Sequence, residues 1–246
     1  MFYSLVRFLL RTLGRILFWP KVSGLDNVPD QGPVILVTNH LGVGEAILLV
    51  AFMRRPVIFP AKQELFRTNT PPRWLFTMIL RGMHQVPMDR TGGEAAADGL
   101  GCLHQVLAES GMMAIMPEGH RSEDGRLYKG RTGVARLALA SSAPVVPIGC
   151  FRTRFVFKWL PFPWLFRPEA RIGEPFHFPE ETKRAYLEAS SHDEAAIVLR
   201  QATDEVMRRI QAITGQEMVD SYSYHPKKAS QDRVKAIKET TTSNPS

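Results

Sequence analysis

His40 and Glu45 are the two residues of this chain whose types and spacing are best suited to chemistry. They lie five positions apart, on either side of a glycine-containing turn, and an apolar run at residues 33–37 (Pro-Val-Ile-Leu-Val) precedes them. A carboxylate beside an imidazole fixes the tautomer of the ring and raises its basicity, so the pair suits removal of a proton from a hydroxyl.

The same spacing of a histidine and a carboxylate occurs at two other places. Asp89 follows His84, and Glu109 follows His104, at the same interval. Only His40 stands at the end of a continuous apolar strand, which is where α/β proteins hold their sites. We therefore select His40 and interpret His84 and His104 as histidines without a catalytic role.

Three further sequence blocks follow the His40 block in a fixed order. They are residues 82–90 (Gly-Met-His-Gln-Val-Pro-Met-Asp-Arg), 116–122 (Met-Pro-Glu-Gly-His-Arg-Ser) and 143–148 (Ala-Pro-Val-Val-Pro-Ile). In this order and spacing the four blocks resemble the glycerolipid acyltransferase family typified by 1-acylglycerol-3-phosphate acyltransferase. The resemblance covers about residues 22–176.

The resemblance implies an enzyme that moves a fatty acyl group from an acyl thioester to a hydroxyl of a lysophospholipid in phospholipid biosynthesis. The donor would be acyl-CoA or acyl carrier protein, and the favoured acceptor would be 1-acylglycerol-3-phosphate. His40 would be the general base, oriented by Glu45. No Gly-x-Ser-x-Gly elbow is present, so direct attack by the acceptor is favoured over a covalent acyl-enzyme. Neither a metal nor a nucleotide cofactor is implied.

The resemblance also implies a set of residues that hold the phosphate of the acceptor. It assigns Lys62, Arg90 and Arg121 to the phosphate oxygens, which cations of this kind bind well. Glu118 and Gly119 belong to the same region. We expect Glu118 to organise the loop or to hold an arginine or a substrate hydroxyl, and Gly119 to permit close approach of the backbone.

Two residues depart from the family pattern. Glu45 stands where the family has Asp, and His120 stands where the family has Thr. A glutamate can accept the same hydrogen bond, so the chemistry is retained. Two alternatives stay open: an acyltransferase for a glycolipid or another lysolipid, and a lipid-binding protein with altered chemistry on the same scaffold.

The first 20 residues predict an amphipathic helix at a membrane surface. Arg7, Arg11 and Arg15 recur at helical spacing among Leu, Ile and Phe residues, and Pro20 ends the pattern. The segment is too short and too charged to span a bilayer, and it lacks a signal-peptide cleavage site. We expect it to hold the protein peripherally on the cytosolic face of the cell membrane. The alternative is a helix packed on the core of the protein.

Composition fits a single domain with a membrane partner. The chain has 246 residues, 44% of them hydrophobic, and no Pro/Gly/Ser-rich linker interrupts residues 25–215. Its net charge of +7, without a basic cluster or nucleic-acid motif, favours a phospholipid surface over nucleic acid. Cys102 and Cys150 are interpreted as buried free thiols of a protein in a reducing compartment.

Alternating strands and helices predict an α/β domain at residues 21–215, with a mostly parallel sheet covered by helices. By the resemblance, its fold would be like that of glycerol-3-phosphate acyltransferase. The predicted strands are 34–37, 57–60, 84–86, 112–116 and 145–148, and the predicted helices are 45–52, 74–80, 94–109, 132–140 and 193–213.

Two segments fall outside this alternation. Residues 151–166 are rich in aromatic residues and arginine and are interpreted either as a membrane-facing or acyl-lining segment or as a hydrophobic edge of the core. Residues 216–246 are polar, and we expect a mobile tail.

Overall fold

The computed structural model describes residues 2–66, 70–88, 94–154 and 167–223. Six strands form one sheet in the order β1-β9-β8-β2-β6-β3. Every neighbouring pair is parallel except β8 and β9, which are antiparallel. The strands are β1 (Lys21–Ser23), β2 (Val34–Thr38), β3 (Val57–Ile58), β6 (Met112–Ile115), β8 (Val145–Phe151) and β9 (Glu169–Ile172).

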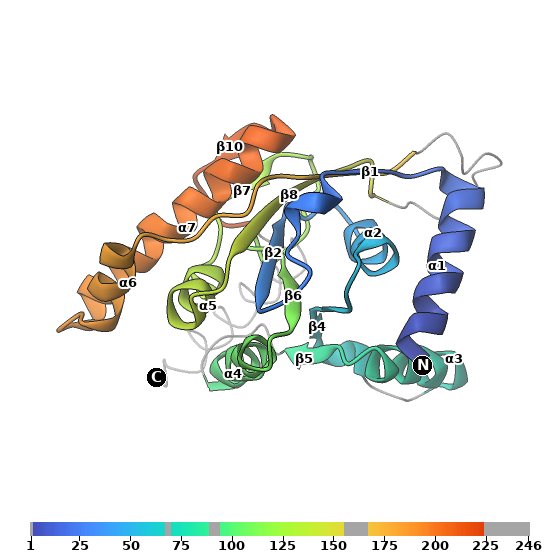
Figure 1. The fold of residues 1–246 in the computed structure, drawn as a ribbon, viewed down its shortest axis with the longest axis horizontal. Helices are drawn as coiled ribbons and strands as arrows, with labels where there is room; N and C mark the ends of the chain where they lie inside the picture. Colours follow the sequence, from blue (N-terminus) through green and yellow to red (C-terminus); the bar gives the residue numbers. More distant parts are fainter. Residues whose placement is uncertain (1, 67–69, 89–93, 155–166, 224–246) are drawn as a thin grey trace, which may run out of the picture.

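Helices cover both faces of this sheet. Figure 1 shows α5, α6 and α7 on one side of it and α1 and α2 on the other. The helices are α1 (Phe2–Phe18), α2 (Gly44–Phe52), α3 (Pro71–Gly82), α4 (Glu94–Ala108), α5 (Gly133–Ser141), α6 (Glu180–Leu187) and α7 (His192–Thr214). Two small parallel pairs complete the fold: β4 (Pro60–Lys62) with β5 (Val86–Met88), and β7 (Leu127–Tyr128) with β10 (Met218–Val219). The prediction of a single α/β domain with a mostly parallel sheet is confirmed.

The apolar run of β2 is explained by burial on both faces. Ile35 and Val37 belong to the hydrophobic cluster beneath α4, α5 and α7. Val34 and Leu36, which point the other way, belong to the cluster beneath α2. A strand between two cores needs apolar residues at every position, because successive side chains point to opposite faces.

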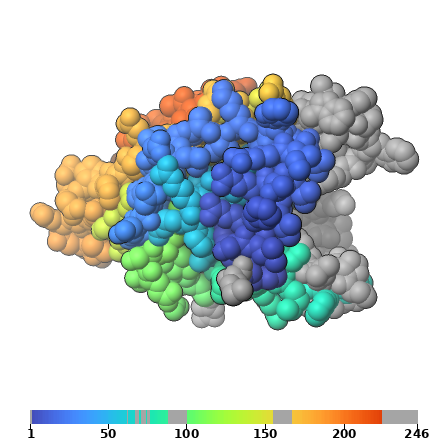
Figure 2. Space-filling view, turned by 45° about the vertical axis from the view of Figure 1, so that its right-hand side comes forward, coloured from blue at the N-terminus to red at the C-terminus, as the bar shows by residue number. Residues whose placement is uncertain are grey.

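Helix α1 packs against the body and still leaves an apolar side exposed. Tyr3, Val6 and Leu10 contact the cluster beneath α2, and the Tyr3 hydroxyl accepts a hydrogen bond from the Val57 amide at 2.9 Å. Figure 2 shows the outer side of the helix, in dark blue, at the surface. Its exposed apolar residues are Phe2, Leu5, Phe8, Leu9, Leu13, Ile16 and Leu17. Within the described ranges, no helix has the length and apolar character needed to cross a membrane.

The arginines of α1 contact the body of the protein. Arg7 donates to the Arg54 carbonyl at 3.0 Å, and the guanidinium groups of Arg11 and Arg15 lie 5.8 and 5.7 Å from the centre of the Phe52 ring. The arginine stripe therefore borders the protein rather than the exposed apolar side. The contacts confirm packing on the core for one side of the helix. Its association with a membrane stays a prediction.

Several local predictions were wrong. The strand predicted at 84–86 lies two residues later, at Val86–Met88, because His84 has a φ of 57° in the turn that precedes it. Cys102 is exposed on α4, whereas Cys150 is buried as expected. The tail predicted from Gln216 begins with ordered residues, since β10 pairs with β7. Of the aromatic segment 151–166 and the tail, residues 155–166 and 224–246 lie outside the described residues.

Candidate active site

The turn that holds His40 follows the carboxyl end of β2, and Asn39 fixes it to β8. Asn39 Oδ1 accepts from the Cys150 amide at 2.8 Å, and Nδ2 donates to the Cys150 carbonyl at 2.9 Å. The same Nδ2 donates to Gln216 Oε1 at 2.9 Å. A buried amide side chain thus continues the pairing of β2 with β8 one residue beyond the strand.

The main chain of His40 is held at both ends by the loop after β6. Its amide donates to Glu118 Oε1 at 2.8 Å, and its carbonyl accepts from the Ser122 amide at 2.8 Å. The block at residues 116–122 therefore sets the position of the predicted base through the backbone, independently of the side chain at position 40.

Glu118 organises this loop. It is fully buried, and its second oxygen, Oε2, accepts from the Tyr128 amide at 3.0 Å. The pKa of Glu118 is raised to about 7. Burial is the main cause, the nearby charges of Glu45 and Asp124 add to the rise, and the two backbone hydrogen bonds oppose it. Of the roles expected for Glu118, its hydrogen bonds match the first, the organisation of the loop, since both oxygens accept from backbone amides.

Glu45 lies in the first turn of α2 and turns back over the His40 turn. Its Oε1 accepts from the amides of Leu41 and Gly42 and from the Thr153 hydroxyl, the last at 2.9 Å. Burial raises the pKa of Glu45, and these hydrogen bonds oppose the rise. Its Oε2 is buried and accepts no hydrogen bond from the described residues. The orientation of the His40 ring by Glu45 stays a prediction.

The segment after β8 completes the enclosure of the site. A Cβ atom at Gly42 would lie 2.8 Å from the Thr153 carbonyl oxygen, so only glycine permits this approach. Arg154 donates to the carbonyls of Ser122, at 3.0 Å, and Glu123. The sequence analysis missed Thr153 and Arg154. Their position could have indicated them, because they follow the strand of the fourth block, and site residues often follow the carboxyl ends of parallel strands.

The structure describes only some of the side chains that are predicted to bind phosphate. Lys62 is the last residue of β4, but its side chain, like all of Arg90, lies outside the described residues. Arg121 is exposed, and no described residue is paired with its guanidinium. Gly119 has a φ of 73°, and a Cβ there would lie 2.8 Å from Arg131 Nε. The predicted close approach at Gly119 is therefore to the Arg131 side chain.

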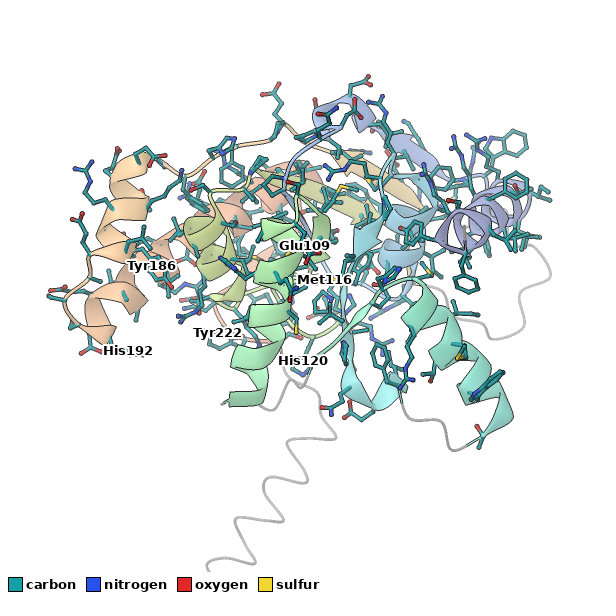
Figure 3. The ribbon with its side chains drawn as sticks, turned by 60° about the horizontal axis from the view of Figure 1, so that its bottom comes forward. Glu109, Met116, His120, Tyr186, His192 and Tyr222 are labelled. Atoms are coloured by element: carbon teal, nitrogen blue, oxygen red, sulfur yellow. The ribbon has the colours of Figure 1, made fainter. Side chains whose placement is uncertain are left out.

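His84 and His104 are exposed, whereas His120 is half-buried between Glu118 and Ser122 in the loop that holds His40. His104 is exposed on α4, whose carboxyl end precedes Glu109; Figure 3 labels Glu109 there, and Met116 and His120 on the connection from β6 to α5. Within the ranges that the structure covers, no three His, Cys, Asp or Glu side chains gather as a metal site would require.

Comparison with known proteins identifies relatives of this fold and site. A family model described as Acyltransferase matches residues 20–151. The chain is 30% identical over 158 residues to a 1-acyl-sn-glycerol-3-phosphate acyltransferase of Limnanthes alba, covering 57% of this chain and 53% of that protein. It is 25% identical over 136 residues to the protein of the same name from Borreliella burgdorferi, covering 55% and 52%.

An uncharacterised protein of Mycobacterium tuberculosis is 29% identical over 167 residues, covering 64% of this chain and 44% of that protein. The chain thus spans about half the length of the curated relatives it matches. The crystal structure of the 1-acyl-sn-glycerophosphate acyltransferase PlsC from Thermotoga maritima superposes with a TM-score of 0.57 at 18% identity, covering 86% and 80% of the two chains. At that identity the match supports the fold alone.

Proposed function

Because this chain belongs to the Acyltransferase family, we propose that it transfers a fatty acyl group from an acyl thioester to a hydroxyl of a lysophospholipid. The donor is acyl-CoA or acyl carrier protein, and 1-acylglycerol-3-phosphate is the acceptor to test first. Two relatives carry that acceptor in their names. The reaction serves phospholipid biosynthesis.

One observation supports this proposal above the others: the third block and the segment after the strand of the fourth block both contact the turn that begins at His40. The third block holds the His40 backbone through Glu118 and Ser122. Thr153, directly after the strand of the fourth block, binds the Glu45 carboxylate. The backbone at the proposed base is thus fixed, and a buried carboxylate binds the next two amides of the turn, which supports a role of His40 in general-base catalysis.

The proposed chemistry is a direct transfer. The His40 imidazole takes the proton of the acceptor hydroxyl as its oxygen attacks the thioester carbonyl. The carbon–sulfur bond then breaks, and the departing thiolate takes this proton from the imidazolium. The Glu45 carboxylate orients the ring and stabilises the imidazolium by its charge, and Arg121 contributes to binding of the acceptor phosphate.

The test is acyl transfer by the purified protein with labelled acyl-CoA, measured on 1-acylglycerol-3-phosphate, on lysolipids with other head groups and on a glycolipid. His40→Ala is expected to lower turnover by roughly 10²–10⁴-fold, the usual contribution of a general base. His104→Ala is the matched control, because it removes a histidine with the same spacing to a carboxylate from an exposed position.

Near-normal turnover in a folded His40→Ala protein would refute the proposed mechanism. If monoacylglycerol and its phosphate are acylated at equal rates, Arg121 and its neighbours do not bind the acceptor. Binding of lysolipid without turnover by the wild type, with either acyl donor, would favour the lipid-binding alternative.

We also propose that the protein works peripherally, at the cytosolic face of the cell membrane, where its substrates reside. The exposed apolar side of α1 supports this location, since an unburied row of Leu, Ile and Phe on a helix suits the acyl boundary of a bilayer.

A further inference from the structure

A basic surface cavity lies where α1, β8 and β9 meet, apart from the His40 site. It has a volume of about 410 Å³ and is lined by Trp19, Pro20, Lys21, Arg152, Arg167 and Glu169. Three cationic side chains therefore face one carboxylate in its lining. A cavity with an excess of positive charge attracts anions.

The single carboxylate is shared between cations inside and outside the cavity, because Arg152 Nη2 donates to Glu169 Oε2 and Arg171 Nε donates to Oε1. Glu169 is buried and accepts from Arg171 Nε at 2.7 Å, and the Arg171 guanidinium stacks 4.5 Å from the centre of the Phe151 ring. Arg152 Nη2 lies 3.2 Å and Lys21 Nζ 3.9 Å from the same carboxylate. Because Arg171, Arg152 and Lys21 share this one carboxylate, Glu169 positions Arg152 and Lys21 while the cluster keeps a net positive charge. The Arg152 side chain remains 58% exposed.

The backbone around this cavity is strained. Trp19, Arg152 and Arg167 have φ values of 45°, 54° and 31°, in the left-handed region that L-residues other than Asn and Asp rarely adopt. These are three of the six such non-glycine residues in the described chain, and all three line this one cavity. Strain of this kind persists where the surrounding structure imposes it, and it concentrates at binding sites.

The cavity is continuous with the apolar side of α1. Trp19, which is 69% exposed, follows the last turn of that helix, and Ile16 and Leu17 are exposed just before it. Tryptophan and arginine together favour the boundary between acyl chains and head groups. The cavity and the His40 site share the segment after β8, because Arg152 immediately precedes Thr153, which binds Glu45.

From this arrangement we propose that the cavity is a binding site for the phosphate of an anionic membrane phospholipid, distinct from the acceptor site. Arg152, Arg167 and Lys21 bind the phosphate oxygens, Trp19 lies at the level of the head groups, and the apolar side of α1 enters the acyl region. The site thus fixes how the carboxyl ends of the parallel strands, where His40 lies, face the bilayer. The inference rests on the proposed membrane association and extends it to a defined head-group site.

The test compares the double variant Arg152→Gln/Arg167→Gln with the control Arg184→Gln/Arg208→Gln, which removes the same charge from exposed positions on α6 and α7. Binding is measured on phosphatidylcholine vesicles with and without phosphatidylglycerol. Each cation near such a surface contributes about 1 kcal/mol, so the site variant is expected to lose about 10- to 30-fold in affinity for the anionic vesicles. The control is expected to bind as the wild type does, and neither variant should change binding to pure phosphatidylcholine.

Acyl transfer between short-chain soluble substrates is measured on the same proteins. Normal transfer with lost vesicle binding supports the head-group site, whereas transfer absent even in the wild type would refute the proposed function and leave the binding result standing. Equal losses in the site and control variants would overturn the inference, because net charge alone would then explain binding. A different result would be that inorganic phosphate stabilises the wild type but not the site variant, while the site variant keeps its affinity for vesicles. That result would assign the cavity to a free phosphate.

Discussion

Burial and hydrogen bonding shift the pKa of Glu45 in opposite directions. Burial disfavours its charge, and the amides of Leu41 and Gly42 and the Thr153 hydroxyl favour it. Because the net result is a raised pKa, Glu45 loses its charge at a higher pH than an ordinary glutamate does. If that charge stabilises the His40 imidazolium, the rate of transfer must fall on the acidic side as Glu45 is protonated.

Thr153 is therefore expected to be a positioning residue that also tunes this titration. Thr153→Val removes one donor to the ionised carboxylate. A hydrogen bond to a charged group is commonly worth 1.5–3 kcal/mol, so kcat should fall by about 10-fold or more. The acidic limb of the kcat–pH profile should move to higher pH, and Thr153→Ser should restore both properties. A lower melting temperature with an unchanged pH profile would show instead that Thr153 has only a structural role.

Glu118 is expected to make the protein less stable as the pH rises. Its pKa is about 7 in the fold against 4.5 for the ordinary group, so the folded state binds this proton more tightly than the unfolded chain does. The free energy of unfolding then decreases between these two values, by an amount on the order of 3 kcal/mol, and is highest below them.

Denaturant unfolding across this pH range checks the prediction. The side chain of Glu118→Gln cannot ionise, so the stability of this variant should depend less on pH than that of the wild type. Its NH₂ group would face the Tyr128 amide, donor against donor, so activity should also fall. Glu123→Gln is the control, since it removes a carboxylate from an exposed position in the same loop. Identical pH slopes in wild type and Glu118→Gln would contradict the assignment.

At the scale of elements, one side of α1 packs on the body, and we propose that the other side contacts the membrane. Tyr3, Val6 and Leu10 close the core over α2, so removal of the whole helix would expose core residues and would not isolate membrane binding. The arginines border Arg54 and Phe52 on the body. The outward Leu, Phe and Ile residues are the part available to a bilayer.

The exposed side of α1 is accordingly expected to provide the apolar part of membrane binding. Changing Leu9, Leu13 and Ile16 to Gln should release the protein from vesicles in a flotation assay, because each buried aliphatic side chain contributes about 1.5–3 kcal/mol. Leu187→Gln/Ile197→Gln changes equally exposed aliphatic residues on α6 and α7 and should have no effect. Retention of the α1 variant on vesicles would move the apolar anchor elsewhere.

At the scale of the whole molecule, the far end of the described chain closes back on the active site. Gln216, just after α7, accepts from Asn39 and donates to the Gly125 carbonyl at 2.6 Å. Next to it, β10 pairs with β7. The residues that hold His40 thus include one that lies beyond the predicted end of the domain.

Gln216→Ala is expected to lower the free energy of unfolding by about 1–2 kcal/mol, because it leaves two groups near the site without their partner. A modest loss of turnover should accompany it, since Asn39 adjoins His40. Gln201→Ala, at an exposed position on α7, is the control in the same denaturant titration. Equal stability of the two variants would show that Asn39 is held by Cys150 alone.

Local patterns were sufficient to predict much of the framework. The strand at Val34, the helix after Glu45 and the long helix from His192 have apolar spacings that depend only on neighbours in the chain, and the structure contains them with small changes at their ends. The short strands β1 and β9 were missed, since three or four residues give no periodicity and their pairing supplies their stability.

The contacts of the site did not follow from such patterns. The Glu118 carboxylate and the His40 amide are 78 positions apart, and Thr153 and Glu45 are 108 apart. The residue types allow many partners at such separations. The sheet order selects among them, because it places β2, β6 and β8 side by side and brings the loops at their carboxyl ends together.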